Sequence, residues 1–343
     1  AVECKVLETL CVERCNLTVP IADILNRSDS IKEVRLQNRT RSPRFRNRGV
    51  ESAVKTSLLE RIACRTVTKL ALLDQIDVED VEVIVNAFPN ITDIEIIVAS
   101  YATLAKLLFL NKNIELLRLT ATTRGVITNN ASALFAAVNE CKTIKKVVLS
   151  SIHNCIYIDP SVLCAVPLRS ITTLSCVFTG GGTRSIAESC NETLEVLMYE
   201  EAQLTIQDVT ALAEHCPNLR VLHARRFIAN TNYAEVLKCC TKIEELRFSV
   251  TPCTYPPTTA PPLEEVLALI VAHCANLEVL GVSNGLGTIQ AEQLQVLCAC
   301  PKLRVIEFPP YSDAGLCSAV SKLGFEVRTI SSVSWPSRLE IEY

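Results

Sequence analysis

The sequence has no long apolar run. No stretch reaches the roughly 18 consecutive apolar residues that a transmembrane helix needs, and no signal-peptide pattern is visible at Ala1. The formal net charge of -3 is small for 343 residues, so charge gives the chain as a whole no preference for a polyanion or a membrane surface. We therefore expect no membrane partner, and any electrostatic preference must be local.

The sequence also lacks the residue patterns that accompany catalysis or metal binding. Its four histidines form no His-Glu-x-x-His motif or paired ligand spacing, and its cysteines form no Cys-x2-Cys zinc pairs. Three glycines at 180–182 allow two interpretations, a phosphate cradle or a simple tight turn, but no Gly-Lys-Ser/Thr ending follows them. No pair of carboxylates stands out either. The sequence therefore predicts a non-enzymatic protein with no catalytic residue, no metal site and no cofactor.

A repeated unit is what the sequence does contain. In Thr205–Ala224, apolar residues first recur at helical spacing, then His215-Cys-Pro-Asn218 ends the helix, and a Leu-x-x-Leu strand core follows. Such a unit cannot bury its own apolar face, so it predicts copies on both sides. The copies are spaced 23 to 36 residues apart, and the first apolar residues of their strands are Leu7, Ile31, Val67, Ile91, Ile114, Ile144, Ile171, Leu194, Leu219, Ile243, Leu277 and Leu303.

These twelve strands, each followed by a short helix, predict one elongated α/β solenoid spanning residues 1–343. We expect a horseshoe with a parallel sheet on the concave face and helices on the convex face. Two long gaps mark insertions, an Arg-rich one at 37–49 and a Pro-rich one at 251–262. The last segment, 325–343, departs from the period and is expected to cap the open end.

Two features of the repeat carry a family resemblance. The segment from Leu7 to Leu17 fits the Leu-x-x-Leu-x-Leu-x-x-Asn/Cys-x-Leu template, and a cysteine precedes the strand by three residues at Cys64, Cys141, Cys216, Cys240, Cys274 and Cys300. On these residues the chain resembles the cysteine-containing leucine-rich repeats of F-box substrate receptors, within the ribonuclease-inhibitor-like horseshoes. The resemblance implies a protein-binding scaffold or a recognition subunit, in particular a substrate receptor of a ubiquitin ligase, although no F-box is visible.

The seventeen cysteines bear on the compartment of the protein. Their recurrence at a helix-to-strand corner favours small, buried, reduced thiols in a cytoplasmic or nuclear protein. Disulfides in an extracellular receptor are the alternative, and six glycosylation sequons support it. Asn90 and Asn191 weaken that support because they stand at strand starts, where a glycan would clash.

Strand alternation selects the candidate binding residues. Positions two, four and six after each first apolar residue should point into the concave face. An apolar centre follows, formed by Val148, Val177, Val196, Met198 and Val221. Charged or polar neighbours border it: Arg118, Lys146, His223, Arg225, Glu245 and Arg247. An exposed apolar centre with a charged rim is typical of a protein-binding site, but the valines are equally explained by strand propensity.

Nucleic acid is the alternative partner. The Arg-rich insertion and its flank contain arginines without lysine around one aromatic residue, which suits phosphate contacts and base stacking. The residues concerned are Arg35, Arg39, Arg41, Arg44, Phe45, Arg46 and Arg48. This alternative predicts a subunit of an RNA-containing or nucleic-acid-processing assembly, whereas a solvated surface loop is the simpler interpretation.

Overall fold

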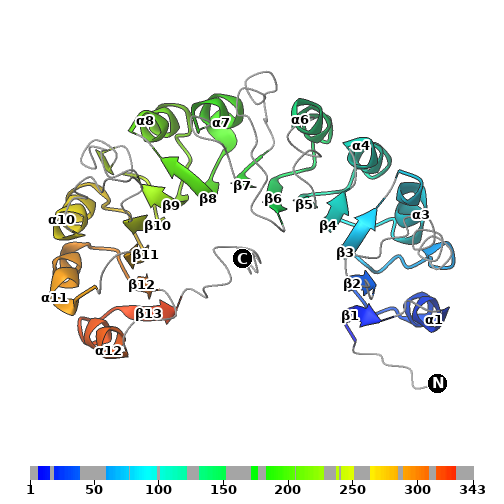
Figure 1. Cartoon of the computed structure of the whole chain (residues 1–343), viewed down its shortest axis with the longest axis horizontal. Coiled ribbons are helices and arrows are strands. Elements are labelled where there is room, and N and C mark those ends of the chain that lie inside the picture. The colour runs from blue at the N-terminus through cyan, green and yellow to red at the C-terminus, as the bar shows by residue number, and fades with distance from the viewer. Residues whose placement is uncertain are drawn as a thin grey trace, which may run out of the picture. The chain divides into compact units, whose positions relative to one another are not determined.

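The computed structural model describes residues 7–15, 19–38, 59–76, 78–98, 101–121, 131–151, 171–176, 183–204, 206–227, 237–238, 241–250, 263–284, 289–308 and 314–329. The chain divides into two compact units, Ala1–Ile158 and Asp159–Tyr343. In each unit most of the described strands are followed by a helix, and successive strands are parallel (Figure 1). The chain is an α/β solenoid of the leucine-rich-repeat type, as the sequence predicted.

The described part of the first unit contains six strands that pair in sequence order. Its elements are β1 (Thr9–Cys15), α1 (Val19–Arg27), β2 (Glu33–Asn38), β3 (Lys69–Ile76), α3 (Asp80–Ala87), β4 (Asp93–Val98), α4 (Tyr101–Leu110), β5 (Leu116–Ala121), α6 (Ala131–Glu140) and β6 (Lys146–Ser151).

Seven strands are described in the second unit, and they also pair in sequence order. Its elements are β7 (Thr173–Cys176), α7 (Thr183–Cys190), η3 (Asn191–Thr193), β8 (Val196–Leu204), α8 (Ile206–His215), β9 (Val221–Phe227), β10 (Glu245–Val250), α10 (Leu263–His273), β11 (Val279–Asn284), α11 (Ala291–Leu294), η4 (Gln295–Ala299), β12 (Val305–Phe308), α12 (Ala314–Lys322) and β13 (Glu326–Thr329).

The apolar period explains both the strand positions and the core. All twelve predicted strands are present, and each begins two residues after its predicted first apolar residue. In the repeat of β4, Ile91, Ile94 and Ile96 are at most 1% exposed. Alternation in the strand turns Ile94 and Ile96 toward the helices, and the same positions in the other repeats form the layer between sheet and helices.

Backbone hydrogen bonds fix the register of neighbouring repeats. The carbonyl oxygen of Glu195 accepts from the amides of both Arg220 and Val221, at 2.9 and 3.1 Å. The carbonyl of Arg220 does the same for the next repeat, accepting from Glu244 and Glu245 at 2.8 and 3.1 Å. The same pair of bonds opens β2 to β6 in the first unit and β8 to β12 in the second. Equivalent residues of neighbouring repeats within each unit therefore stand side by side along the sheet.

The sequence missed a thirteenth strand. β13 lies inside the segment predicted as a terminal cap and pairs in parallel with β12. The position two residues before this strand, where the other repeats have Leu, Ile or Val, is Gly324, whose φ of 96° favours glycine. The first apolar residue, by which the other strands were recognised in the sequence, is therefore absent here. The prediction that residues 325–343 act as a cap remains untested.

Buried thiols occupy the predicted corners. Cys64, Cys141, Cys216, Cys274 and Cys300 are all buried, whereas the sixth corner residue, Cys240, lies outside the described part of the chain. Burial raises the pKa of the Cys216 thiol to about 12, so this sulfur stays protonated and poorly reactive near neutral pH. That all these thiols are reduced remains a prediction.

Only the first two residues of one predicted insertion belong to the described part of the chain. Gln37 and Asn38, the first two residues of the Arg-rich insertion, belong to β2. The rest of that insertion and the Pro-rich insertion at 251–262 lie outside the described residues. No helix in the described part of the chain is long and apolar enough to cross a membrane.

Candidate functional site on the sheet face of the second unit

The candidate site lies on the sheet face that points away from the helices. Residues at paired positions of neighbouring strands form two rows that run across this face. One row contains Val221, Glu245, Val279 and Val305. The second row contains His223, Arg247, Gly281 and Glu307. We call the second of these the central row. In the central row, ionisable side chains come from β9, β10 and β12, and a glycine comes from β11 between them.

Arg247 is the centre of the site. Its Nε donates to Glu307 Oε2 at 2.6 Å and its Nη2 donates to Glu307 Oε1 at 3.0 Å, which is the two-pronged geometry of a strong arginine–carboxylate pair. Nη2 also lies 2.9 Å from Glu245 Oε1. Arg247 therefore links its own strand, β10, to β12 across the intervening strand β11.

Gly281 allows this long-range pair. It stands between Arg247 and Glu307 in the central row, and a Cβ placed on it would lie 2.7 Å from Cγ of Arg247. The arginine side chain therefore lies flat across the backbone of β11, where only a glycine leaves room.

His223 extends the network by one strand. Its Nε2 lies 2.7 Å from Glu245 Oε1. Burial lowers the pKa of His223, against the opposing effect of the Glu245 hydrogen bond, so near neutral pH the neutral ring donates its Nε2 proton to the carboxylate. Burial alone would raise the pKa of Glu245, but the His223 hydrogen bond and the Arg247 charge hold it below its ordinary value. The carboxylate is therefore ionised at neutral pH.

The network is partly open to solvent. The Arg247 side chain is 27% exposed, whereas the Glu307 side chain is 8% exposed. No described residue accepts a hydrogen bond from Nη1 of Arg247. At the end of the sheet, Arg328 of β13 donates to Glu326 at 2.8 Å, and both side chains are more than half exposed. The face thus presents charged groups whose positions are already fixed.

A smaller network of the same design occurs on the sheet face of the first unit. Arg35 of β2 reaches across Ala71 of β3 to Glu95 of β4, with 3.7 Å between Nη2 and Oε2. Nearby, Arg118 donates to Asp93 at 2.8 Å. Burial raises the pKa of Asp93, and the Arg118 charge opposes this rise. Arginine, small residue and glutamate on three successive strands therefore form a recurring arrangement.

The burial of the predicted apolar centre corrects one expectation. Val148, Met198 and Val221 are only 7%, 3% and 7% exposed, although we expected an exposed patch. Neighbouring strands are only about 4.8 Å apart, so adjacent side chains cover one another. That these residues face the concave side remains a prediction. His223 was also expected at an exposed rim, and it is 2% exposed.

The remaining predicted site residues divide between the two units. Val196 and Lys146 are half-buried, and the Arg118 side chain is 28% exposed. Arg225 lies in β9, but its side chain is outside the described part, as is Val177 altogether. Because Arg118, Lys146 and Val148 belong to the first unit and the others to the second, the predicted continuous surface remains a prediction.

Sequence reasoning missed Glu307, Gly281 and Arg328. The signal was available for the first two, because they stand four residues after Leu303 and Leu277, but the predicted set of binding residues ended two strands too early, at Arg247. Arg328 could not be found in this way, since its strand lacks the first apolar residue.

Of the residues proposed to bind nucleic acid, Arg35 alone belongs to the described part of the chain. Arg35 lies in strand β2, not in a loop, and Glu95 stands within ion-pair distance of it. Its charge is therefore partly compensated within the sheet. The six other residues, Arg39, Arg41, Arg44, Phe45, Arg46 and Arg48, lie outside the described residues.

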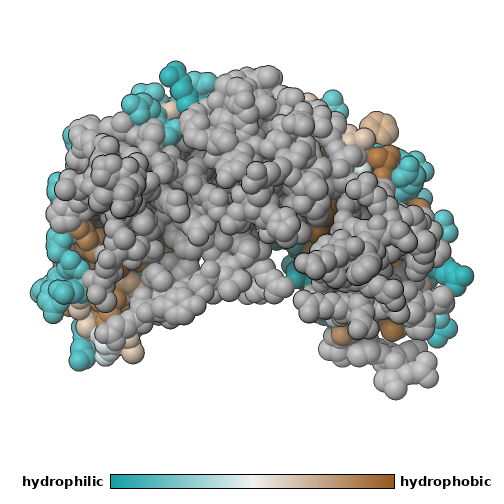
Figure 2. Space-filling model, viewed as in Figure 1, coloured by the Kyte–Doolittle hydropathy of each residue, from teal (hydrophilic) through white to brown (hydrophobic). Residues whose placement is uncertain are grey.

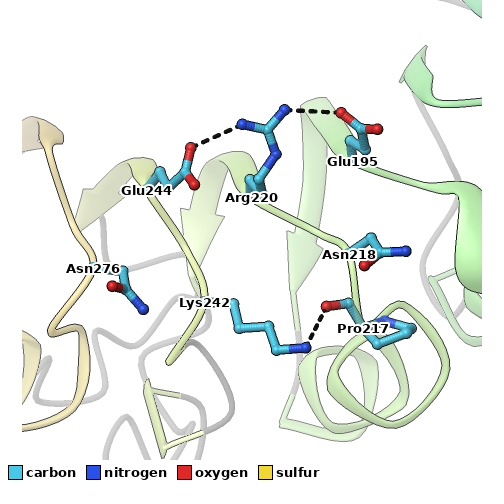
Figure 3. A pocket seen from close by; sticks show the side chains of 7 residues that line it. All are labelled: Glu195, Pro217, Asn218, Arg220, Lys242, Glu244 and Asn276. Carbon is cyan, nitrogen blue, oxygen red and sulfur yellow. Dashed lines mark hydrogen bonds and ion pairs between the residues drawn. The ribbon is translucent and has the colours of Figure 1, made fainter.

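A shallow pocket of about 370 Å³ lies at the edge where the strands of the second unit begin (Figure 3). Arg220 points between Glu195 and Glu244 and pairs with both, at 2.9 and 3.0 Å. Lys242 donates to the carbonyl of Pro217 at 2.9 Å. These polar groups already join neighbouring repeats, so we assign the pocket a structural role. Among the described residues, no group of three or more His, Cys, Asp or Glu side chains could hold a metal ion.

Comparison with known proteins leaves the family open. No protein-family model matches the chain, and no curated protein matches it. Among solved structures, the crystal structure of the Rad7 and Elc1 complex in yeast is similar over 80% of this chain and 82% of that chain, with 10% sequence identity and a TM-score of 0.41. A likeness at this level carries no argument about function, which must be inferred from the side chains of the site.

Proposed function

We propose that the protein is a non-enzymatic recognition subunit that binds a protein partner through the sheet face of its second unit. The observation that carries this proposal is the fixed position of Arg247. Glu307 and Glu245 hold its Nε and Nη2, while its Nη1 faces no described acceptor. A partner carboxylate or carbonyl could be bound there at little further cost in side-chain entropy.

The surroundings of Arg247 suit a protein partner. Val196 and Val279 are half-buried apolar residues on β8 and β11, and Arg328 and Glu326 are exposed on β13. Partly exposed apolar side chains beside ordered charges are common in protein interfaces, where arginine is enriched. Neither a nucleophile with an adjacent base nor an acid–base pair facing a cavity stands among the described residues of this face, which favours binding over catalysis.

A finer proposal follows from the resemblance of the repeats to those of F-box substrate receptors. In that case the protein would select a substrate for a ubiquitin ligase in the cytoplasm or nucleus. The nucleic-acid alternative gains no support from the described residues, because Arg35 is engaged with Glu95.

Affinity capture from a native extract tests the proposal. The whole chain would be compared with Arg247→Gln, which keeps a polar side chain of moderate size, and with Val196→Glu on the same face. Arg184→Gln is the matched control, because Arg184 is an arginine on helix α7 that also pairs with a carboxylate, Glu188. We expect both face variants to lose the same captured proteins and the control to retain them.

Two outcomes would contradict the proposal. If Arg247→Gln and Val196→Glu fold normally and capture the same proteins as the natural chain, the partner binds elsewhere. If the captured material depends on RNA and is removed by ribonuclease, the nucleic-acid alternative replaces the proposal.

A further inference from the structure

The outer side of the first unit carries an aromatic side chain that packing does not explain. Phe109, near the end of α4, is 71% exposed, and its neighbour Leu110 is 39% exposed. On the same helix, Leu104, Leu107 and Leu108 are each 2% exposed, so the core side of α4 is already filled. Figure 2 shows brown and tan residues gathered beside teal ones on the outer surface over α4.

Basic side chains stand beside this apolar surface. Nζ of Lys112 lies 5.3 Å from the centre of the Phe109 ring, within the range of a cation–π contact. Lys142 is exposed at the equivalent corner of the next repeat. The two corners are joined, because the hydroxyl of Thr143 donates to the carbonyl of Lys112 at 2.7 Å.

These two lysines differ from others of the same unit. Lys106 is paired with Glu82 at 3.0 Å, and Lys32 is paired with Glu8 at 3.3 Å. No described carboxylate lies within ion-pair distance of Lys112 or Lys142. Two exposed acidic residues lie near them in sequence: Glu115, three residues after Lys112, and Glu140, two residues before Lys142 at the end of α6.

We propose that Phe109, Leu110, Lys112 and Lys142 form a second docking site, for a short acidic segment of a partner protein that carries one apolar side chain. The apolar side chain would pack on the exposed face of Phe109 and on Leu110. The carboxylates would bind Lys112 and Lys142. This site lies on the helix side, so it goes beyond the sheet-face site proposed above and does not depend on it.

The size of the surface selects this occupant. A stable interface between folded proteins needs roughly 800 Å² from each partner, and two apolar side chains with two lysine stems provide far less. A second copy of this chain is therefore a poor fit, whereas a short segment with one anchoring side chain suits a site of this size. The positive charges favour acidic residues around the anchor.

Panning of a phage-displayed library of random peptides, each of about twelve residues, against the whole chain would test the proposal. We expect enriched peptides that combine Asp or Glu with one apolar residue. Synthetic versions of these peptides would then be measured by fluorescence anisotropy. Phe109→Ala should weaken their binding by about tenfold or more, as truncation of a central anchor does.

Charge variants make the test specific. Lys142→Gln should weaken binding several-fold and reduce its salt dependence, whereas Glu140→Gln should strengthen binding because it removes a repulsive carboxylate. Ile24→Ala is the matched control, since Ile24 is another exposed apolar residue of the first unit, at 48% exposure. It should leave peptide affinity unchanged.

Several results would overturn the proposal. These are the absence of any enriched peptide, enrichment of neutral or basic peptides, and binding that Phe109→Ala leaves intact. Loss of folding in Phe109→Ala would show instead that the ring is structural. Self-association in analytical ultracentrifugation that Phe109→Ala abolishes would assign the surface to a second copy of the chain.

Discussion

Replacing Gly281 with alanine should disrupt the ion pair at the centre of the sheet-face network. The new Cβ would lie 2.7 Å from Cγ, 3.2 Å from Cβ and 3.3 Å from Cδ of Arg247. These atoms are at the base and middle of the side chain, so a small movement of its tip cannot relieve the contact. Arg247 must therefore rise from the sheet and loosen its two hydrogen bonds to Glu307.

The loss in free energy of unfolding caused by loosening this ion pair lies between two limits. Removal of a fully exposed ion pair costs about 0–1 kcal/mol, and breaking a buried one costs about 3–5 kcal/mol. Glu307 is buried, but Arg247 is about a quarter exposed, so we take about 2–3 kcal/mol for the loosened pair. Alanine also restricts the unfolded chain, which returns about 0.4–1 kcal/mol. The free energy of unfolding should therefore fall by about 1–2.5 kcal/mol.

A natural counterpart in the first unit supports this estimate. There the bridged residue is already an alanine, Ala71, and the ion pair across it is longer, at 3.7 Å between Arg35 and Glu95. A Cβ in this position is thus compatible with a looser pair. Gly281→Ala should resemble it, with the protein still folded.

Urea denaturation followed by circular dichroism measures the effect. The same substitution would also be made in a Glu307→Gln background, where the pair has lost its charge. If our reasoning holds, Gly281→Ala costs less there than in the natural chain. An equal cost in both backgrounds, or no cost in the natural chain, would show that Arg247 does not depend on the open space at Gly281.

Three further predictions concern other residues of the second unit. Met198→Glu should destabilise the second unit by several kcal/mol, because it places a carboxylate where the side chain is 3% exposed; thermal unfolding measures this, and a normal melting temperature would contradict the observed burial. The thiol of Cys216 donates to the carbonyl of Ala187 at 3.8 Å. Cys216→Ser should cost about 1–3 kcal/mol if its shorter hydroxyl does not reach this carbonyl, and Cys216→Ala should cost less; equal costs in urea denaturation would show that the hydroxyl is accommodated. The pKa of His223 is lowered below its ordinary value of 6.5 in the folded state, so the unfolded chain binds the proton more readily and stability falls as the pH drops below about 6.5. The lowered pKa of Glu245 acts in the same direction at more acidic pH. His223→Gln should therefore reduce the loss of melting temperature between pH 7 and pH 5.5, and an unchanged loss would exclude His223 as its source.

The sequence by itself determined the repeat, its strands and its core. Residues such as Ile91, Ile94 and Ile96 recur at fixed spacing because each repeat must bury the same positions against its neighbours. Local periodicity therefore predicted twelve strand starts and the buried corners of Cys64 and Cys216. It missed β13, whose first apolar residue is replaced by Gly324.

Only the tertiary structure decided how the sheet face is used. Period-two alternation predicts on which face of the sheet Met198 and His223 lie, but not that they are buried there. The pair of Arg247 and Glu307 joins residues sixty positions apart, across a glycine that belongs to neither repeat. The sequence around Arg247 or Glu307 does not predict that the two residues pair. Their pairing depends on the stacking of three strands and on the space left at Gly281. Packing between repeats, and not the repeat itself, therefore determines which charged groups are open to a partner and which are paired within the protein.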